Sequence, residues 1–383
     1  MRIDAVEVWR EHLPLSKPYT ISRETISDVE LFFVRIHAGE LSGAGCASPA
    51  VEVTGESPTD CHAALDAAAD LLAGKDSRAI GNLARQLERE LPATPAARAA
   101  CDMAMWDLLG KHLGTPVVDL LGRAHEALPT SVTIGIQSTG AAVALARESV
   151  AQGFRALKVK LGRDVDDDAD RLRQIRAAVG PAIALRTDPN AGYDGAELRR
   201  YLSATRDLAL EFCEQPVMRG AEAALSELPV SKRARLAADE SILGLTDAGG
   251  LLDEPRPYGI FNLKLMKCGG ISPARRIAHL AEATGIELMW GCNDESRISI
   301  AAALHVALAS PATRYLDLDG SFDLARDLAT GGFVLEKGLL RTAPGAGLGV
   351  HWEVGDGSAR KRTDRAQRPA EVVPPIANPG AQR

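Results

Sequence analysis

The pattern of apolar positions divides the chain into two parts with different rhythms. Between residues 131 and 320, short apolar segments rich in β-branched and aliphatic residues alternate with segments of helical periodicity. Seven helix candidates separate eight strand candidates, which is the number expected for a (β/α)7β barrel. The strand candidates are residues 131–136, 156–162, 183–190, 210–216, 235–241, 259–267, 286–294 and 314–320. An open doubly wound sheet fits the same alternation, but no GxGxxG motif follows the first strand candidate, which disfavours a dinucleotide-binding fold.

Residues 1–121 show a different pattern of apolar positions. Residues 1–57 contain segments in which apolar and polar residues alternate, as in half-buried strands, and residues 58–121 have helical periodicity. Strands followed by helices are typical of an α+β domain. We therefore expect an α+β domain over residues 1–125 and the barrel domain over residues 126–325.

The end of the chain is expected to contain no further barrel unit. Residues 326–355 have the pattern of a strand, a turn and a strand, and we expect them to return to the first domain. Residues 356–383 are polar and rich in proline, with too little apolar surface to form a core. They are expected to be a disordered tail.

Composition narrows the class of protein. A net charge of −7 over 383 residues argues against a nucleic-acid partner, which requires a basic surface. No apolar run has the length of a membrane span, and the N-terminus lacks the apolar core of a signal peptide. The six cysteines form no CxxC pair, as expected for free thiols in a reducing compartment. We therefore expect a soluble cytoplasmic protein that has no membrane partner.

Three acidic residues lie at the ends of consecutive strand candidates. They are Asp188, Glu214 and Asp239. In a barrel the carboxyl ends of the strands converge on one face, where active sites form. Three carboxylates there would suit Mg²⁺, which prefers oxygen ligands and keeps positions open for substrate and water. The alternative is a structural cluster of ion pairs between these acids and neighbouring lysines.

Lysines occur on strand candidates on both sides of these acids. Lys158 and Lys160 are two residues apart, so both face the barrel interior, where we expect the two charges to depress each other's pKa. Lys264 lies four strands further on, roughly across the barrel. A base on each face of a substrate is what a racemase or epimerase needs. Schiff-base chemistry is the other role for a barrel lysine, but it needs no metal.

A metal would have a specific purpose in such a reaction. The proton alpha to a carboxylate is very weakly acidic, and its removal makes a dianionic enediolate. A divalent cation that binds the carboxylate oxygens stabilises this charge as it develops.

The chain resembles the enolase superfamily, in its muconate-lactonizing subgroup. The resemblance covers about residues 1–355 and rests on the motifs KVK (158–160), DPN (188–190), EQP (214–216), ADES (238–241) and KLMKCGG (264–270). It implies that the α+β domain is a capping domain and that Asp188, Glu214 and Asp239 hold Mg²⁺. It also implies that Lys160 and Lys264 are the two bases, with Lys158 as a neighbour that lowers the pKa of Lys160.

A narrower resemblance concerns the substrate. Asp317 and Asp319 form a DxD motif on the last strand candidate, and paired carboxylates at a barrel mouth suggest capture of an ammonium group. The motif is similar to the one that holds the dipeptide α-ammonium in the dipeptide epimerases of this subgroup. The alternative is two solvated loop acids. The resemblance thus implies a Mg²⁺-dependent epimerase acting at the α-carbon of the C-terminal residue of a dipeptide.

Other reactions of the same subgroup remain open. They are N-acyl amino acid racemization, o-succinylbenzoate synthesis and muconate cycloisomerization, whose substrates do not need the acidic pair. A catalytically silent barrel that binds a regulatory ligand is a further alternative. Homo-oligomers are common in the family, so we expect one here.

The side-chain pocket departs from relatives that act on Ala-Glu. The position of their arginine in the first capping loop falls on Glu24, and Glu52 and Asp294 add further negative charge. An acidic lining should attract a basic or neutral side chain and repel an acidic one. We therefore expect a neutral or cationic dipeptide rather than Ala-Glu. Thr133, at the end of the first strand candidate, is a further candidate for substrate contact.

Overall fold

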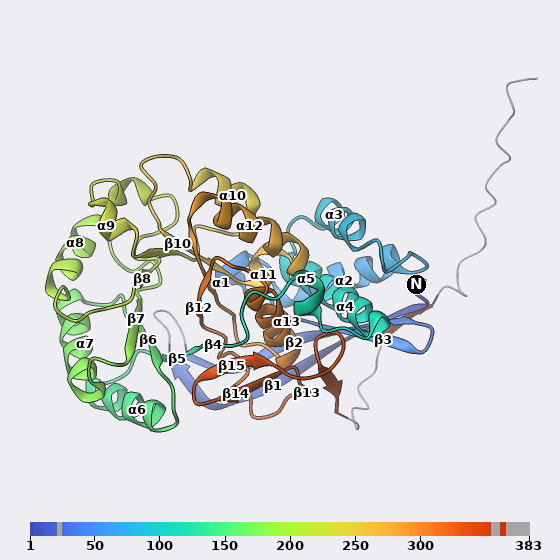
Figure 1. The fold of residues 1–383 in the computed structure, drawn as a ribbon, viewed down its shortest axis with the longest axis horizontal. Helices are drawn as coiled ribbons and strands as arrows, with labels where there is room; N and C mark the ends of the chain where they lie inside the picture. The colour runs from blue at the N-terminus through green and yellow to red at the C-terminus, as the bar shows by residue number, and fades with distance from the viewer. Residues whose placement is uncertain (21–24, 354–360, 365–383) are drawn as a thin grey trace, which may run out of the picture.

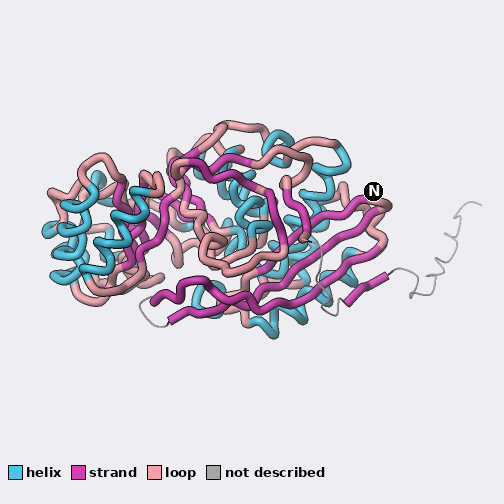
Figure 2. Tube along the Cα trace, turned by 90° about the horizontal axis from the view of Figure 1, so that it is seen from below, coloured by secondary structure: helices cyan, strands magenta, loops and turns pink. Residues whose placement is uncertain are grey.

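An antiparallel sheet and a group of helices form the N-terminal domain of the computed structural model, which describes residues 1–20, 25–353 and 361–364. Three strands of the sheet are β1 (Ala5–Thr20), β2 (Thr25–Ala38) and β3 (Leu41–Ala47), a short C-terminal strand being the fourth, and the long strands run side by side along one flank of the molecule (Figures 1 and 2). The helices are α1 (Val51–Thr54), α2 (Pro58–Leu72), α3 (Ile80–Glu90), α4 (Pro95–Leu113) and α5 (Val117–Leu121).

Glycines allow α4 to lie directly on the sheet. A Cβ atom on Gly43 would lie 1.9 Å from the carbonyl oxygen of Ala104, and one on Gly45 would lie 1.9 Å from that of Ala100. Any side chain at these two positions of β3 would therefore push the helix away. The close packing buries most of α4, including Asp102 and Asp107.

Eight parallel strands form the second domain. They follow one another in chain order around the sheet, and a parallel bridge between Thr130 and Leu316 joins the first strand region to the last. The strands are β5 (Ser131–Ile134), β6 (Ala156–Lys160), β7 (Ala184–Asp188), β8 (Cys213–Glu214), β9 (Leu236–Ala238), β10 (Ile260–Leu263), β11 (Glu287–Trp290) and β12 (Thr313–Leu316). Each lies within or beside the segment expected for it, so the barrel prediction is confirmed.

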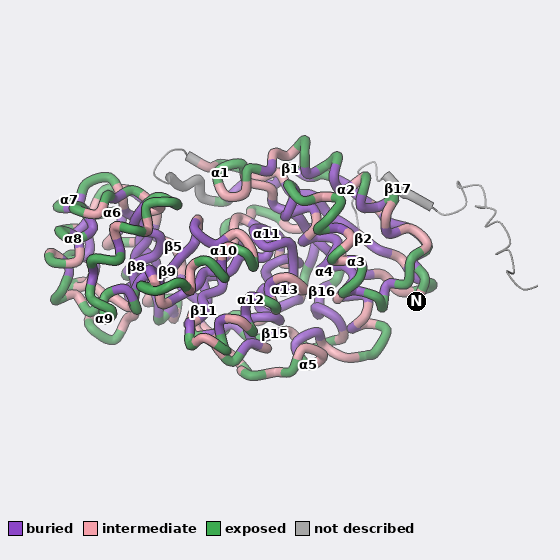
Figure 3. The backbone as a smooth tube through the Cα atoms, turned by 90° about the horizontal axis from the view of Figure 1, so that it is seen from above, coloured by how far each residue is buried: buried purple, intermediate pink, exposed green. Residues whose placement is uncertain are grey.

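Helices separate the barrel strands and cover their outer face (Figure 1). They are α6 (Thr139–Ala151), α7 (Val165–Val179), α8 (Gly195–Ala204), the 3-10 helix at Glu222–Leu225, α9 (Val230–Arg233), α10 (Leu245–Gly250), α11 (Leu265–Cys268), α12 (Ile271–Thr284) and α13 (Arg297–Leu308). Side chains cap several of them: the Asp164 carboxylate accepts the backbone N–H groups of Asp166 and Asp167 at the start of α7. Figure 3 shows that α7, α8 and α9 have exposed residues, whereas α11 and α13 are almost entirely buried.

The C-terminal segment forms short strands that connect the two domains. The strand β13 (Ala329–Gly331) pairs with β16 (Val350–Trp352), and β14 (Phe333–Glu336) and β15 (Leu339–Thr342) extend from β4 (Leu128–Pro129). The Trp352 ring lies 5.1 Å from that of Trp9 in β1. The domain boundaries themselves stay a prediction.

Four residues of the tail expected over residues 356–383 are described by the structure. Lys361–Asp364 form β17, which pairs in antiparallel register with the start of β1. The outer edge of β1 offers unpaired backbone groups there, and a polar segment can satisfy them without an apolar core of its own. The rest of the expected tail lies outside the described residues. Among the described helices, none has both the length and the apolar character needed to cross a membrane.

Candidate active site

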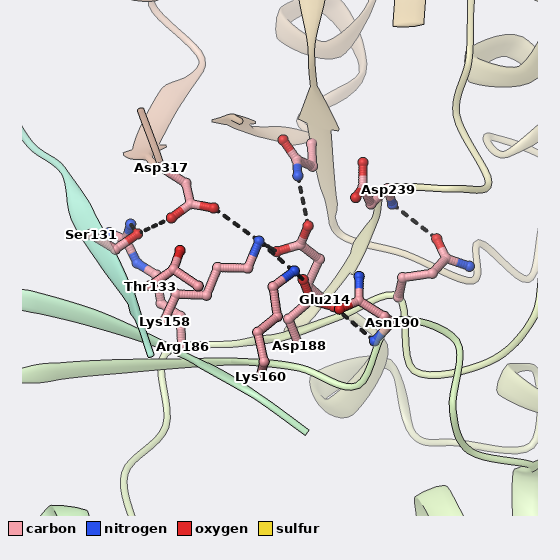
Figure 4. Close-up of polar contacts among 12 residues, drawn as sticks. Ser131, Thr133, Lys158, Lys160, Arg186, Asp188, Asn190, Glu214, Asp239 and Asp317 are labelled. Atoms are coloured by element: carbon pink, nitrogen blue, oxygen red, sulfur yellow. Dashed lines mark hydrogen bonds and ion pairs between the residues drawn. The ribbon is translucent and has the colours of Figure 1, made fainter. Parts of the chain in front are cut away.

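Three buried carboxylates form a row at the carboxyl ends of adjacent barrel strands. Asp188 ends β7, Glu214 ends β8, and Asp239 directly follows β9. Their residues are 0%, 0% and 3% exposed. Because these parallel strands are neighbours in the sheet, their ends bring the three acids to one place at the barrel mouth (Figure 4).

Lys158 connects this row to the last strand of the barrel. Its Nζ atom lies 3.0 Å from Asp188 Oδ2, 2.8 Å from Glu214 Oε2 and 2.9 Å from Asp317 Oδ2. Lys160, two residues further along β6, points the same way and places its Nζ 2.7 Å from Asp188 Oδ2. Both lysines of the KVK motif therefore enter the barrel mouth together.

Lys264 contacts the other end of the row. It directly follows β10, and its Nζ lies 2.9 Å from Asp239 Oδ2. Lys160 and Lys264 thus contact the two outer acids, Asp188 and Asp239, with Glu214 between them in strand order.

Lys267 also reaches Asp239, although in the strand candidate 259–267 a residue three positions after Lys264 would point away from it. Its Nζ lies 2.5 Å from Asp239 Oδ1 and donates hydrogen bonds to the carbonyl oxygens of Asp239 and Asn262. The expectation treated residues 264–267 as strand, but Leu265–Cys268 form the short helix α11. The helical turn that begins after Lys264 brings Lys267 back toward it, and the Lys267 backbone N–H donates to the Lys264 carbonyl oxygen, so both lysines meet the same carboxylate.

Electrostatics at Lys158 also correct an expectation. Burial alone would lower the pKa of Lys158, but the charges of Asp317, Glu214 and Asp188 outweigh it and raise the pKa well above its usual value. Lys160 was expected to lower the pKa of Lys158, but these three acids have the opposite and larger effect. At Lys264, likewise, burial opposes protonation, but the charge of Asp239 prevails and raises the pKa.

The carboxylates of the row respond to the same charges in different ways. Burial would raise the pKa of Asp188, but Lys160 and Lys158 together lower it to about 2. Burial and the negative charge of Asp188 raise the pKa of Glu214 to about 8. Two buried carboxylates that repel each other in this way are a setting in which a divalent cation would be stabilising.

The donor set fits a hard divalent cation. Carboxylate oxygens are ligands that Mg²⁺ prefers, and the three acids supply them from one face of the barrel. As the side chains stand, however, the described residues contain no group of three His, Cys, Asp or Glu side chains already gathered as a metal site. The ammonium group of Lys158 lies against both Asp188 and Glu214 instead. The residues therefore have the chemistry for Mg²⁺, and the ligand set stays a prediction.

Two amide side chains, those of Asn262 and Gln215, and the backbone N–H of Asn190 hold the acids in place, and none of the three was expected from the sequence. Asn262 Nδ2 donates to Glu214 Oε1 over 2.7 Å, and Gln215 Oε1 accepts the backbone N–H of Asp239 over 2.9 Å. Asn190 donates its backbone N–H to Asp188 Oδ1 over 2.9 Å. Two of these residues could have been found from the sequence, because Asn190 and Gln215 belong to the DPN and EQP motifs.

The DxD motif is built into the barrel rather than left in solvent. Asp317 is 5% exposed, and besides Lys158 it accepts a hydrogen bond of 2.5 Å from Ser131 Oγ. Asp319 Oδ2 accepts the backbone N–H of Thr133 over 2.7 Å, which is the contact the structure gives this candidate substrate residue. Burial would raise the pKa of Asp317, but Lys158 lowers it, whereas burial and the charge of Asp317 raise the pKa of Asp319 to about 7.

Arg186 is a charged residue near this site that sequence reasoning missed. It lies on β7, and its Nη1 atom donates to Ser131 Oγ over 3.1 Å and to the carbonyl oxygen of Leu316 over 2.6 Å. Its guanidinium also pairs with Glu211. Arg186 belongs to no motif that would mark it in the sequence. Its contacts show that it supports Ser131, which donates a hydrogen bond to Asp317.

The expected side-chain pocket is only partly described. Glu24 lies outside the described residues. Glu52 is exposed on α1, a helix that packs near α11, and Asp294 is half-buried in the loop after β11. Ser48, directly after β3, links this loop to the first domain, because its Oγ donates to the Asp294 carbonyl oxygen over 2.8 Å. The capping-domain segment that contains Glu52 is therefore close in sequence to a contact at the barrel mouth.

Comparisons with known proteins agree with this architecture. Residues 3–122 match the mandelate racemase/muconate lactonizing enzyme N-terminal domain, and residues 141–356 match the enolase C-terminal domain-like family. The chain is 53% identical to an L-Lys-D/L-Arg epimerase of Methylococcus capsulatus, over 91% of this chain and 99% of that protein. It is 31% identical to an L-Ala-D/L-Glu epimerase of Bacillus subtilis, over 91% and 97% of the two chains.

A solved structure shows the same fold. It is the dipeptide epimerase of Methylococcus capsulatus complexed with Mg and the dipeptide L-Arg-D-Lys, which superimposes with a TM-score of 0.90 at 53% identity and covers 92% of this chain and 100% of that one. The chain therefore belongs to the mandelate racemase/muconate lactonizing enzyme family of the enolase superfamily.

Proposed function

We propose that this protein is a Mg²⁺-dependent dipeptide epimerase that inverts the α-carbon of the C-terminal residue and prefers dipeptides with cationic side chains. The observation that carries the proposal is the placement of Lys160 and Lys264 against the two outer carboxylates of one buried row. Epimerization needs one group to remove the α-proton and another to return a proton from the other side. Lys160 and Lys264, at opposite ends of the row, are suited to perform one of these two proton transfers each.

Each lysine has a separate part in this mechanism. Lys160 and Lys264 exchange protons with the substrate α-carbon, each on its own side. Lys158 is less exposed than Lys160 and contacts three carboxylates, so it holds the acids rather than the substrate proton. Asp188, Glu214 and Asp239 would hold Mg²⁺. When bound, Mg²⁺ supplies positive charge to the substrate carboxylate while the α-proton is being removed.

The DxD motif gives the site a place for the substrate ammonium group. Asp317 is already paired with Lys158, and the Asp319 carboxylate accepts the backbone N–H of Thr133. A cationic ammonium near Asp319 would favour the charged form of that carboxylate, which burial and Asp317 disfavour. This pair favours a dipeptide with a free N-terminus over the acylated or carboxylate substrates of other reactions in the subgroup.

Negative charge near the barrel mouth supports the preference for cationic side chains. Glu52 and Asp294 lie on the capping-domain and barrel sides of this region. An acidic lining attracts Lys and Arg side chains and repels glutamate. The Methylococcus capsulatus relative acts on L-Lys-D/L-Arg, which is consistent with the same preference here.

We also propose that the protein is a cytoplasmic homo-oligomer. Its six cysteines are free, and five of them are buried, which suits a reducing compartment. Light scattering of the purified protein would determine the number of subunits.

A dipeptide panel tests the proposed function. The protein is incubated with Mg²⁺ in deuterated water, and mass spectrometry measures deuterium incorporation into L-Lys-L-Arg, L-Arg-L-Lys, L-Ala-L-Leu and L-Ala-L-Glu. We expect the cationic dipeptides to exchange fastest and L-Ala-L-Glu slowest. Glu52→Gln and Asp294→Asn should narrow this difference, whereas Glu126→Gln, an acid that is 88% exposed elsewhere, should not. Fastest exchange of L-Ala-L-Glu would refute the preference, and no exchange of any dipeptide would refute the activity.

A further inference from the structure

The second base, Lys264, is carried by a segment that the capping domain holds. Lys264 directly precedes α11, and its carbonyl oxygen accepts the backbone N–H groups of Lys267 and Cys268 within that short helix. All four residues of α11 are buried, and the helix packs against α4 and near α1 of the capping domain (Figures 1 and 3). Lys160, in contrast, lies on β6, whose strand neighbours are β5 and β7 of the barrel.

One buried carboxylate makes the main polar connection between α4 and this segment. Asp102, which is 1% exposed, accepts the backbone N–H of Ser272 over 2.8 Å and its hydroxyl over 2.6 Å. Trp106, one turn further along α4, donates its Nε1–H to the same hydroxyl over 2.9 Å. Ser272 lies in the first turn of α12, where backbone N–H groups have no partner within the helix.

The turn between α11 and α12 is shaped to fit α4. Gly269 and Gly270 both have positive φ, and the N–H of each returns to the carbonyl oxygen of Leu265. A Cβ atom on Gly270 would lie 2.7 Å from the Cβ and Oδ2 atoms of Asp102. The carboxylate therefore lies directly on the backbone that ends α11, and the two glycines of the KLMKCGG motif make this approach possible.

We propose that Asp102 of the capping domain is a positioning residue for Lys264. Its carboxylate fixes the start of α12, the glycine turn links α12 to α11, and α11 fixes the backbone from which the Lys264 side chain extends toward Asp239. No comparable contact from α4 is recorded for Lys160 among the described residues. The capping domain thus positions Lys264, whereas Lys160 is positioned by the barrel. This inference rests on the proposed two-lysine epimerization.

If Asp102 positions only Lys264, substitution of Asp102 should slow removal of the α-proton on one side of the substrate only. Epimerization needs both lysines, so a defect in either one slows the full reaction. Loss of the α-proton into deuterated water, measured separately from each epimer at early times, reports on the lysine that removes that proton. The Lys160→Ala and Lys264→Ala variants assign one epimer to each lysine.

Asp102→Asn tests the inference, because the N–H and the hydroxyl of Ser272 donate to different carboxylate oxygens and the substitution replaces one of these oxygens with an NH2 group. We expect exchange from the epimer assigned to Lys264 to slow about tenfold more than exchange from the other, with kcat reduced and KM little changed. Ser272→Ala, which removes only the hydroxyl, should shift the same ratio in the same direction by a smaller factor. This milder variant keeps the test valid if Asp102→Asn folds poorly.

Asp107→Asn is the matched control. Asp107 is a second buried acid on α4, but it accepts from the backbone N–H groups of Ala44 and Leu348 and from Lys111, not from the α11–α12 segment. Its substitution should leave the ratio between the two epimers unchanged. Equal slowing of both epimers in Asp102→Asn and Ser272→Ala would overturn the positioning role. If Lys264→Ala itself fails to distinguish the epimers, the two-lysine function fails instead.

Discussion

The Nζ atom of Lys158 lies 2.9 Å from Oδ2 of Asp317, so the first lysine of the KVK motif and the first aspartate of the DxD motif form one buried ion pair. Lys158 lies on the second strand, β6, and Asp317 directly follows the last strand, β12, so the two residues come from either side of β5. The same ammonium group contacts Asp188 and Glu214. The residues expected to support the base and those expected to bind the substrate ammonium therefore form one electrostatic unit.

A double-mutant cycle on Lys158 and Asp317 should show strong coupling. Lys158→Met leaves the buried carboxylate of Asp317 without its ammonium partner, a change that typically costs about 3–5 kcal/mol in the free energy of unfolding. Asp317→Asn should cost less, because Lys158 keeps its contacts with Asp188 and Glu214. The double variant should lose clearly less than the sum of the single losses. Denaturant unfolding at neutral pH measures all four proteins.

An exposed pair provides the control for this cycle. Arg199 and Glu227 are also 2.9 Å apart but are 50% and 71% exposed, so their coupling should stay below about 1 kcal/mol. If the losses in unfolding free energy from Lys158→Met and Asp317→Asn were additive, the ion pair would make no specific contribution to stability.

Asp319→Asn should weaken binding of substrates that have a free ammonium group. We expect kcat/KM for a dipeptide to fall about 10- to 100-fold, the size of a lost charge-assisted hydrogen bond of about 1.5–3 kcal/mol. Steady-state kinetics with the N-acetylated form of the same dipeptide give the comparison, because that substrate has no ammonium group to lose. An equal proportional loss for both substrates would indicate general damage rather than loss of ammonium recognition.

The site was predictable where a residue's role depends on its position at a strand end. Asp188, Glu214 and Asp239 converge because alternating strands and helices place successive strand ends on one face of a barrel. Lys267 was misjudged because a short apolar run does not show where a strand changes into a helical turn. Arg186 and the raised pKa of Lys158 depend on partners from distant strands, and strand periodicity alone does not identify these partners.

A histidine away from the site should make stability depend on pH. His305 is fully buried on α13, where its Nδ1 accepts the backbone N–H of Val118 over 2.9 Å. Burial lowers the pKa of His305 from 6.5 to about 4. The unfolded chain therefore takes up a proton first as the pH falls, so the stability gained from the neutral ring is complete above pH 6.5 and is lost between about 6.5 and 4. The loss should amount to about 3 kcal/mol.

His305→Gln measures this contribution. The difference in unfolding free energy between wild type and the variant should shrink as the pH falls from 7 to 4.5. His279→Gln, at an exposed position on the neighbouring helix α12, serves as the control for the general effect of the substitution. A difference for His305→Gln that stays constant with pH would show that the histidine is not held neutral.

The central claim is that Lys160 and Lys264 act on the same α-carbon from different sides. The most direct measurement is deuterium exchange from each purified epimer of a cationic dipeptide, by Lys160→Ala and Lys264→Ala in the presence of Mg²⁺. We predict that neither variant epimerizes and that each exchanges the α-proton of only one epimer, a different one in each variant. Exchange of both epimers by either variant, or of the same epimer by both, would contradict the two-lysine mechanism.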